Sequence, residues 1–357
     1  MKMSRTAKGV ALALLGFCSS LPVAHACTRL VYLGDDHQTI TARSMDWAWD
    51  VETNLWVFPK GMSREGEAGK NSVKWTSKYG SVIASGYDNS TTDGMNEAGL
   101  TANLLWLVES EYPKVDGNKP GLTIAAWAQY VLDNFKTVDE AVKALKAEPF
   151  IVMTGPVPGQ NRPATLHLSL SDASGDSAII EYIGGKQVIH HDRAYQVMTN
   201  SPIFEKQLAD YAAWQAGGKK DLPGSSTSFD RFVRASYYVH AVPGKEDTRT
   251  SLASVFSVIR NVSVPYGITT PGQPNISSTR WRTVSDHKQK QYFFESAVTP
   301  NTFWVDLTKL DFSHETGKVR KLELGPNQNK VYSGEVSERF EESQPFTFQS
   351  AAEHDRA

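Results

Sequence analysis

The chain has 357 residues, of which 40% are hydrophobic and 21% are charged, and its formal net charge is −2. A charge so close to zero argues against nucleic acid or an anionic membrane surface as a partner. The length is sufficient for one large domain or two small ones.

The first 26 residues have the order of features that is typical of a cleaved secretory signal. Basic residues precede a short apolar run, Val10 to Phe17, and Ala24-His25-Ala26 has the small-x-small pattern of a cleavage site. A membrane span needs about 18 uninterrupted apolar residues, which this run does not reach. We therefore expect export to the periplasm, no stable membrane association, and a mature chain of 331 residues (357 minus 26).

The mature chain alternates strand and helix patterns. Apolar alternation and turn motifs predict strands at 27–33, 39–43, 81–87, 100–107, 165–171, 177–182, 196–200, 279–286, 291–295 and 302–307. Helical spacing predicts helices at 123–134, 137–147, 204–214, 231–242 and 251–260, with a capping box at Thr137-Val138-Asp139-Glu140 and a cap for the helix at 231–242 within Ser225-Ser226-Thr227-Ser228. Strands at both ends with helices between them fit one α+β domain over residues 27–345, with two packed sheets. The polar residues 346–357 are expected to form a frayed tail.

Cysteine usage points to chemistry at the new N-terminus. Cys18 lies in the signal segment, so Cys27 is the single cysteine of the mature chain and its first residue. A lone thiol in an exported protein is a spare group, a lipid attachment site or a catalytic group. The free α-amine of such a residue has a pKa of about 7.7–8.0 and can take the thiol proton and return it to a leaving amine. We predict that Cys27 is the nucleophile of an amide hydrolase.

Other catalytic arrangements have weaker support. His190 and His191 are adjacent, so their side chains would point apart on a strand, and the sequence has neither His-Glu-x-x-His nor Gly-x-Ser-x-Gly. We expect no metal and no cofactor. Ala24-His25-Ala26-Cys27 partly resembles a lipid attachment site, so a lipid-anchored ligand-binding protein stays an alternative, although the usual aliphatic residue is missing.

Arg43 ends the second predicted strand, and Asp46 follows it three residues later. Pairing of 28–33 with 39–43 would bring both side chains near Cys27. A guanidinium lowers the pKa of a nearby thiol, and a carboxylate can hold the ammonium form of the α-amine. The alternative is an ordinary surface ion pair.

Three tryptophans come directly after Asp46, at Trp47, Trp49 and Trp56. Aromatic residues at this density are suited to lining an apolar acyl pocket. Core filling is the alternative for each of them.

Several segments, taken together and in order, resemble the choloylglycine hydrolase family, which comprises bile salt hydrolases and penicillin V acylases within the N-terminal nucleophile hydrolases. The resemblance extends over about residues 27 to 310 and is carried by Cys27-Thr28-Arg29, Arg43-Ser44-Met45-Asp46-Trp47, Asp93-Gly94-Met95-Asn96-Glu97-Ala98-Gly99-Leu100, Met198-Thr199-Asn200-Ser201-Pro202, Ser228-Phe229-Asp230-Arg231-Phe232-Val233-Arg234-Ala235 and Trp281-Arg282-Thr283-Val284-Ser285-Asp286. It implies a four-layer αββα sandwich, a small N-acyl substrate and a homotetramer.

The resemblance also implies roles for individual residues. Cys27 is the nucleophile and supplies the α-amine base, while Arg43 and Asp46 support the thiolate and the amine. Asn200 donates its side-chain amide to the oxyanion, and Arg231 completes the polar network. One amide donor at an oxyanion is worth about 3 kcal/mol.

Trp106 departs from the bile salt hydrolase pattern, in which an oxyanion-hole asparagine aligns with it. The backbone N–H, which is the contribution carried over, is retained, but the indole argues against a sterol-sized acyl group and favours a flat aromatic or linear alkyl chain. We accordingly expect Trp47, Trp49 and Trp106 to bind substrate.

The export signal resembles that of a Gram-negative branch of the family linked to penicillin V and N-acyl homoserine lactone deacylation. The prediction is an exported, penicillin V acylase-like cysteine amidase. A conjugated bile salt hydrolase, a neighbouring acid ceramidase-like or peptide-processing amidase, and the lipid-anchored binding protein stay open as alternatives.

Overall fold

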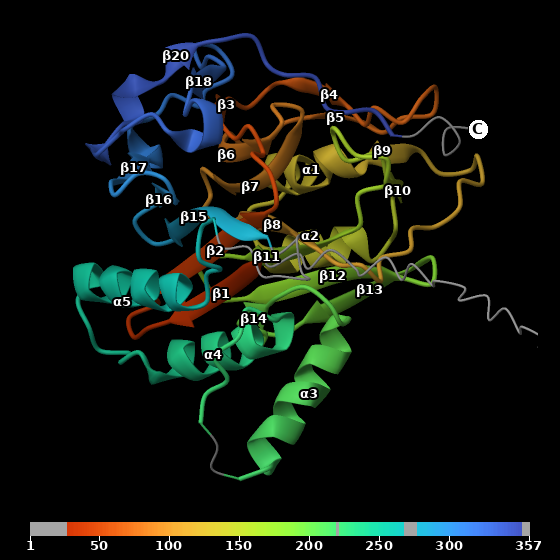
Figure 1. Ribbon diagram of the computed structural model, residues 1–357. Coiled ribbons are helices and arrows are strands. Elements are labelled where there is room, and N and C mark those ends of the chain that lie inside the picture. Colours follow the sequence, from red (N-terminus) through yellow and green to blue (C-terminus); the bar gives the residue numbers. More distant parts are fainter. Residues whose placement is uncertain (1–26, 219–220, 268–276, 352–357) are drawn as a thin grey trace, which may run out of the picture.

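The computed structural model describes residues 27–218, 221–267 and 277–351, and it has four layers (Figure 1). The first sheet has seven strands in the order β14 (Val197–Met198), β1 (Thr28–Leu33), β2 (Thr39–Trp47), β15 (Ser278–Asp286), β16 (Gln291–Ser296), β17 (Thr302–Asp306) and β19 (Gly334–Glu335). The second has nine, in the order β13 (Lys186–His191), β12 (Ser177–Ile183), β11 (Leu166–Ser171), β8 (Thr101–Trp106), β7 (Ser90–Asn96), β6 (Ser81–Gly86), β3 (Leu55–Phe58), β18 (Arg320–Leu322) and β20 (Glu341–Glu342).

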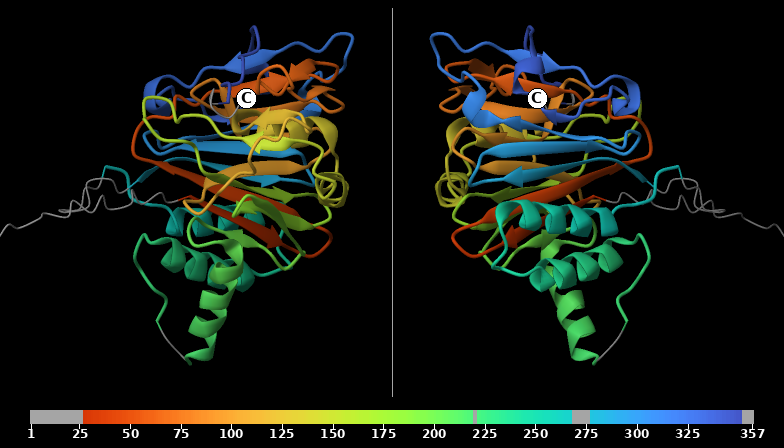
Figure 2. Two further views of the ribbon diagram at one scale, coloured as in Figure 1. Left: turned by 90° about the vertical axis from the view of Figure 1, so that its right-hand side faces the viewer. Right: turned by 90° about the vertical axis from the view of Figure 1, so that its left-hand side faces the viewer.

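Helices cover the outer faces of the two sheets. The first sheet carries α4 (Ser228–Ala241) and α5 (Thr248–Asn261), with α3 (Phe204–Ala216) packed on α4. The second sheet carries α1 (Trp127–Asn134) and α2 (Val138–Leu145). In Figure 2 the green and teal helices of the first sheet project on one side of the molecule, away from α1. This arrangement confirms the predicted α+β class and αββα sandwich.

Two short two-stranded sheets complete the strands. They pair β9 (Gly121–Thr123) with β10 (Ile151–Met153), and β4 (Ser63–Glu65) with β5 (Lys74–Thr76). Short 3-10 turns lie at Ile124–Ala126, Leu307–Lys309, Pro326–Gln328 and Ser337–Arg339. No helix within the described ranges is both long and apolar enough to cross a bilayer.

Helix caps explain where α2 and α4 begin. The hydroxyl of Thr137 accepts a hydrogen bond from the backbone N–H of Glu140, which confirms the predicted cap of α2. Thr227, in the predicted Ser225 to Ser228 cap, accepts from the N–H of Asp230. The helix therefore begins at Ser228, three residues before its predicted start, and Arg231 lies in its first turn.

The hairpin of β1 and β2 sets the register at the start of the mature chain. Thr28 pairs with Ser44 and Arg29 with Arg43, so Cys27 lies beside the last residues of β2. All nine residues of β2 are buried, because the strand is central and pairs with β15 on its other edge. The structure thus confirms the predicted proximity of Cys27 to the segment after residue 43.

Two apolar cores hold the layers together. One lies between the sheets and reaches α4 and α5, and it includes Leu30, Trp281, Phe294 and Phe232. The other fills the space between the second sheet and α1 and α2, and it includes Trp56, Trp127 and Leu168. Trp56 is therefore a core residue, as the alternative interpretation of the tryptophan cluster held.

Residues 346–351 differ from the predicted frayed tail. The ring of Phe346 lies 5.2 Å from that of Trp56, edge to face, and Phe348 is only 6% exposed. The hydroxyl of Thr123 donates to the carbonyl of Gln349 at 2.7 Å. The prediction was wrong for this segment because two phenylalanines within the polar sequence cover the second apolar core. The predicted signal, residues 1–26, and the last six residues of the predicted tail lie outside the described residues.

Candidate active site

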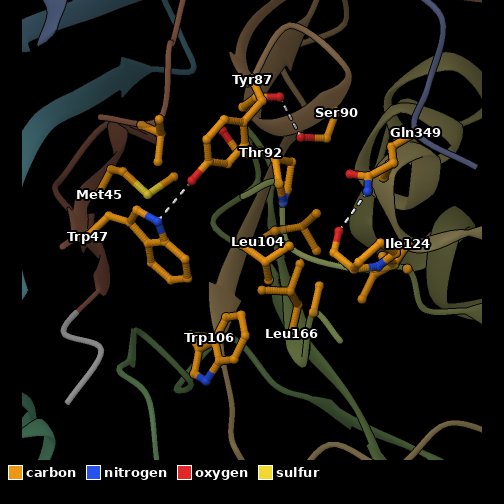
Figure 3. A pocket seen from close by; sticks show the side chains of 18 of the residues that line it. Met45, Trp47, Tyr87, Ser90, Thr92, Leu104, Trp106, Ile124, Leu166 and Gln349 are labelled. Carbon is orange, nitrogen blue, oxygen red and sulfur yellow. Dashed lines mark hydrogen bonds between the residues drawn. The ribbon is translucent and has the colours of Figure 1, made fainter. Parts of the chain in front are cut away.

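Cys27 is 3% exposed and contributes to the lining of an apolar pocket between β2, β8 and the loop before β11. Its Sγ lies 3.8 Å from the carbonyl oxygen of Asp46. Burial raises the pKa of the Cys27 thiol, and the positive charge of Arg43 opposes that rise. The pocket is also lined by Arg43, Met45, Trp47, Tyr87, Leu104, Trp106, Ile124, Val157, Ala164, Leu166 and Gln349, many of which Figure 3 shows pointing toward its centre.

Arg43 reaches the pocket from β2. One of its terminal nitrogens donates to the carbonyl of Leu104 at 2.8 Å, and its guanidinium carbon lies 4.6 Å from the ring centroid of Trp281. Its Nε and Nη1 are buried and have no hydrogen-bond partner within the described structure. These two donors and the positive charge suit Arg43 to stabilising negative charge that forms near Cys27.

Asp46 lies near the end of β2, opposite Thr279 of β15, and is fully buried. Thr279 donates to one of its carboxylate oxygens at 2.6 Å, and Ser44 donates to the other at 3.3 Å. Burial raises the pKa of Asp46 to about 6, against the opposing charge of Arg231. At neutral pH the group is therefore mostly ionised and is able to hold a cation next to Cys27. No sequence motif indicated the contribution of Thr279.

Arg231 connects the start of the mature chain to Asn200. Its Nη1 donates to the carbonyl of Cys27 and, at 2.7 Å, to the hydroxyl of Thr28. Its Nη2 donates to Oδ1 of Asn200 at 2.8 Å. Burial lowers the pKa of Arg231, while Asp46 opposes that change.

The side chain of Asn200 has a defined orientation because Arg231 binds its oxygen. The amide nitrogen therefore faces the backbone of Trp106 and donates to the Trp106 carbonyl at 2.8 Å. An amide nitrogen carries two hydrogens, so Asn200 has a second N–H to offer to an acceptor in the site. The structure thus brings together five of the predicted residues, which are Cys27, Arg43, Asp46, Asn200 and Arg231.

Two of the three predicted substrate-binding tryptophans line the pocket. The rings of Trp47 and Trp106 lie 5.4 Å apart, and the Trp47 indole donates to the hydroxyl of Tyr87 at 3.0 Å (Figure 3). Trp49 differs from the prediction, because it lies in a bend beyond the end of β2, is 50% exposed and does not line the pocket. The role predicted for the Trp106 backbone N–H stays a prediction, since the contact that the structure gives is at the carbonyl.

Several residues that line the pocket were not predicted from the sequence. Tyr87 and Gln349 come from a turn after β6 and from the segment after Pro345, and the loop over residues 155–164 closes another side. In the part of the chain that the structure describes, no group of three or more His, Cys, Asp or Glu side chains is placed to hold a metal ion.

Comparison with known proteins assigns the family. A model described as linear amide C-N hydrolases, choloylglycine hydrolase family, matches residues 27–320. The chain belongs to this family. The match begins at Cys27, and it makes the protein a hydrolase of linear amide C–N bonds.

Individual relatives agree with this assignment. The penicillin V acylase of Pectobacterium atrosepticum is 60% identical over 361 residues, which cover 95% of this chain and 96% of the relative. The bile salt hydrolase/transferase of Clostridium perfringens is 25% identical, over 85% of this chain and 99% of the relative. Among solved structures, a penicillin V acylase from Agrobacterium tumefaciens is 69% identical with a TM-score of 0.85, and it covers 91% of this chain and 100% of its own.

Proposed function

We propose that the chain is cut after Ala26 in the course of export to the periplasm and then removes the acyl group from penicillin V-like amides, with Cys27 as the nucleophile. The observation that carries this proposal is the buried thiol of Cys27 in an apolar pocket, within a network of Arg43, Asp46, Asn200 and Arg231. The family match from residue 27 and the 60% identity to a penicillin V acylase support it.

The proposed reaction begins with proton transfer from the thiol to the α-amine of Cys27, which the cut creates. The thiolate attacks the amide carbon, a C–S bond forms, and the carbonyl electron pair moves to oxygen. That oxyanion accepts the second N–H of Asn200 and the backbone N–H of Trp106. The C–N bond then breaks as the α-ammonium returns its proton to the leaving amine, and water hydrolyses the acyl-thioester.

The charged residues have separate roles in this scheme. Asp46 holds and orients the α-ammonium, because its buried carboxylate is fixed by Thr279 and Ser44. Arg43 stabilises the thiolate through its charge, which lowers the pKa of the Cys27 thiol against the effect of burial. Arg231 positions Cys27 and Asn200 relative to each other.

The pocket favours a flat aromatic or linear acyl group. Its walls include the indoles of Trp47 and Trp106 and the aliphatic side chains of Met45, Leu104 and Leu166. Apolar walls of this kind give no hydrogen bonds to the hydroxyls of a sterol acid, whereas they suit phenoxyacetyl or alkyl chains. Linear alkyl chains extend the proposal to N-acyl homoserine lactones as a second substrate class. We also propose the homotetrameric state that the family resemblance implies.

The test compares the mature chain with variants of its first residue. Mature wild-type protein should show Cys27 as its N-terminus by intact mass and should release 6-aminopenicillanic acid from penicillin V. Cys27→Ser should lose activity by at least about a thousandfold. Cys18→Ser is the matched control, because it removes the thiol that lies in the signal segment and should leave the mature activity unchanged.

Three results would contradict the proposal. A diacylglycerol adduct on Cys27 would make the sulfur a thioether, which cannot attack an amide. An uncut chain that retains residues 1–26 and is fully active would remove the role of the α-amine. Mature wild-type protein that cleaves glyco-conjugated bile salts but not penicillin V or acyl homoserine lactones would overturn the substrate assignment.

A further inference from the structure

Arg162 lies on the loop that closes the pocket beside the candidate nucleophile. Its guanidinium carbon is 4.6 Å from the ring centroid of Trp106 and 5.6 Å from that of Trp47. Neighbours of Arg162 on the same loop, such as Val157 and Ala164, line the pocket. Trp106 connects Arg162 to Asn200, because its ring lies against the guanidinium and its backbone carbonyl accepts a hydrogen bond from the Asn200 amide.

The positive charge of Arg162 has no counter-charge within the described structure. Its Nε donates to the side-chain oxygen of Gln160 at 2.6 Å, and no described carboxylate forms an ion pair with it. Its Nη2 is buried and has no hydrogen-bond partner among the described residues. Burial lowers the pKa of Arg162, because desolvation disfavours the charged form.

The other two arginines near Cys27, Arg231 and Arg43, differ from Arg162 in being buried. The nitrogens of Arg231 are bound to Cys27, Thr28 and Asn200, and Arg43 points from β2 toward Leu104. Arg162 is partly exposed, so it lies at the solvent side of the two indoles. Figure 3 shows Ile124 and Gln349 at the opposite side of the pocket from Trp47, and Ile124, Leu104 and Leu166 give the lining an apolar surface that suits the acyl group.

We propose that Arg162 is a specificity-determining residue that binds a carboxylate on the leaving amine of the substrate. The acyl group occupies the apolar interior, so the leaving amine extends from Cys27 toward the solvent side, where the guanidinium lies on Trp106 and Trp47. A planar guanidinium with an unpartnered N–H matches a carboxylate, and its stacking on the indoles limits its freedom before binding. This inference rests on the proposed function and names the chemistry of its leaving group.

A carboxylate-binding Arg162 would distinguish between the two proposed substrate classes. The leaving amine of penicillin V carries a carboxylate, whereas homoserine lactone carries none. Arg162 should therefore raise kcat/KM for penicillin V and leave the acyl homoserine lactones without this contact. Loss of the Arg162 contact should act mainly by raising KM, because the carboxylate is bound in the ground state and in the transition state alike.

The experiment measures kcat/KM of wild type, Arg162→Gln and Arg162→Lys on penicillin V and on its primary carboxamide, in which a neutral amide of similar size replaces the carboxylate. Arg162→Gln should lower kcat/KM for penicillin V by about tenfold to a hundredfold, while the carboxamide changes by less than about threefold. Arg162→Lys should fall between wild type and Arg162→Gln for penicillin V, since it keeps the charge but not the planar fork. Arg249→Gln, an exposed arginine on α5, is the control for loss of one positive charge.

Each possible outcome has a defined meaning. Equal losses on both substrates would show that Arg162 only supports the indoles, and no loss on either would show that it does not face the leaving amine; both results overturn this inference and leave the proposed function intact. Hydrolysis of neither substrate by wild type would overturn the proposed function and this inference together. A selective loss on penicillin V, absent in Arg249→Gln, would support both.

Discussion

Replacing Asn200 with alanine removes one of the two donors proposed to stabilise the oxyanion. Asn200 is 3% exposed, and its amide bridges Nη2 of Arg231 and the carbonyl of Trp106, each at 2.8 Å. Loss of one such donor costs about 3 kcal/mol in the transition state, which corresponds to a decrease in kcat of about a hundredfold or more. KM should change little, because the donor is worth most when the oxygen carries charge.

The same substitution affects folding less than it affects catalysis. It removes the hydrogen bond that Nη2 of Arg231 donates and one hydrogen bond to the Trp106 carbonyl, at a cost of about 1–3 kcal/mol, which is within the stability of a typical domain. Asn200→Asp keeps the shape of the side chain but makes it an acceptor that pairs with Arg231 and repels the oxyanion. Its kcat should be lower than that of Asn200→Ala.

The assay is release of 6-aminopenicillanic acid at saturating penicillin V, with thermal unfolding as the check on folding. Asn71→Ala is the matched control, since it removes an exposed amide that donates to the carbonyl of Lys119. The oxyanion role of Asn200 would be refuted if Asn200→Ala kept more than about a tenth of the wild-type kcat, or if Asn200→Asp were the more active variant.

Three further predictions concern pH and stability. Thr279→Val removes the 2.6 Å hydrogen bond to the Asp46 carboxylate, so the pKa of Asp46 should rise further above about 6. The acid limb of the pH profile of kcat should then move to higher pH. An acid limb that does not move would show that ionisation of Asp46 does not control catalysis. Burial lowers the pKa of His287 from 6.5 to about 4, so the unfolded chain gains a proton that the folded chain does not as the pH falls through this window. Folding stability should thereby decrease by about 3 kcal/mol, and urea unfolding of His287→Gln at pH 7.5 and pH 4 should lack this part of the pH dependence. Phe348→Ala should lower the free energy of unfolding by about 3–5 kcal/mol, and a change below about 1 kcal/mol would mean that the segment after Pro345 does not pack.

Sequence reasoning succeeded where the structure depends on neighbours along the chain. The hairpin of β1 and β2 fixes the distance between Cys27 and Asp46 through strand register alone, so a turn motif and two alternating segments were enough to predict it. Helix α4 was found from its spacing, and its cap was named correctly.

The positions of Asn200 and Arg231 required the family resemblance. Arg231 reaches Cys27 across 204 positions of sequence, and its approach depends on how α4 packs on β1. No local pattern encodes such packing, because any arginine in a first helical turn looks the same in a sequence.

The remaining differences have local physical reasons. Trp49 lies in a bend beyond β2, where strand alternation no longer assigns a side chain to a face, and it is exposed as a result. Gln349 reaches the pocket because Phe346 and Phe348 anchor a segment whose average composition is polar. An average composition over a dozen residues does not reveal two phenylalanines that pack into the core.

The guanidinium of Arg231 connects the nucleophile and the oxyanion donor, and this affects how the site responds to mutations. Because one rigid plane holds both the Cys27 carbonyl and the Asn200 amide, a small tilt of α4 would carry both groups in the same direction. The separation between sulfur and amide nitrogen would then stay nearly constant while each moved relative to the sheets. Mutations that shift α4 should consequently alter which acyl groups fit before they alter the rate of bond cleavage.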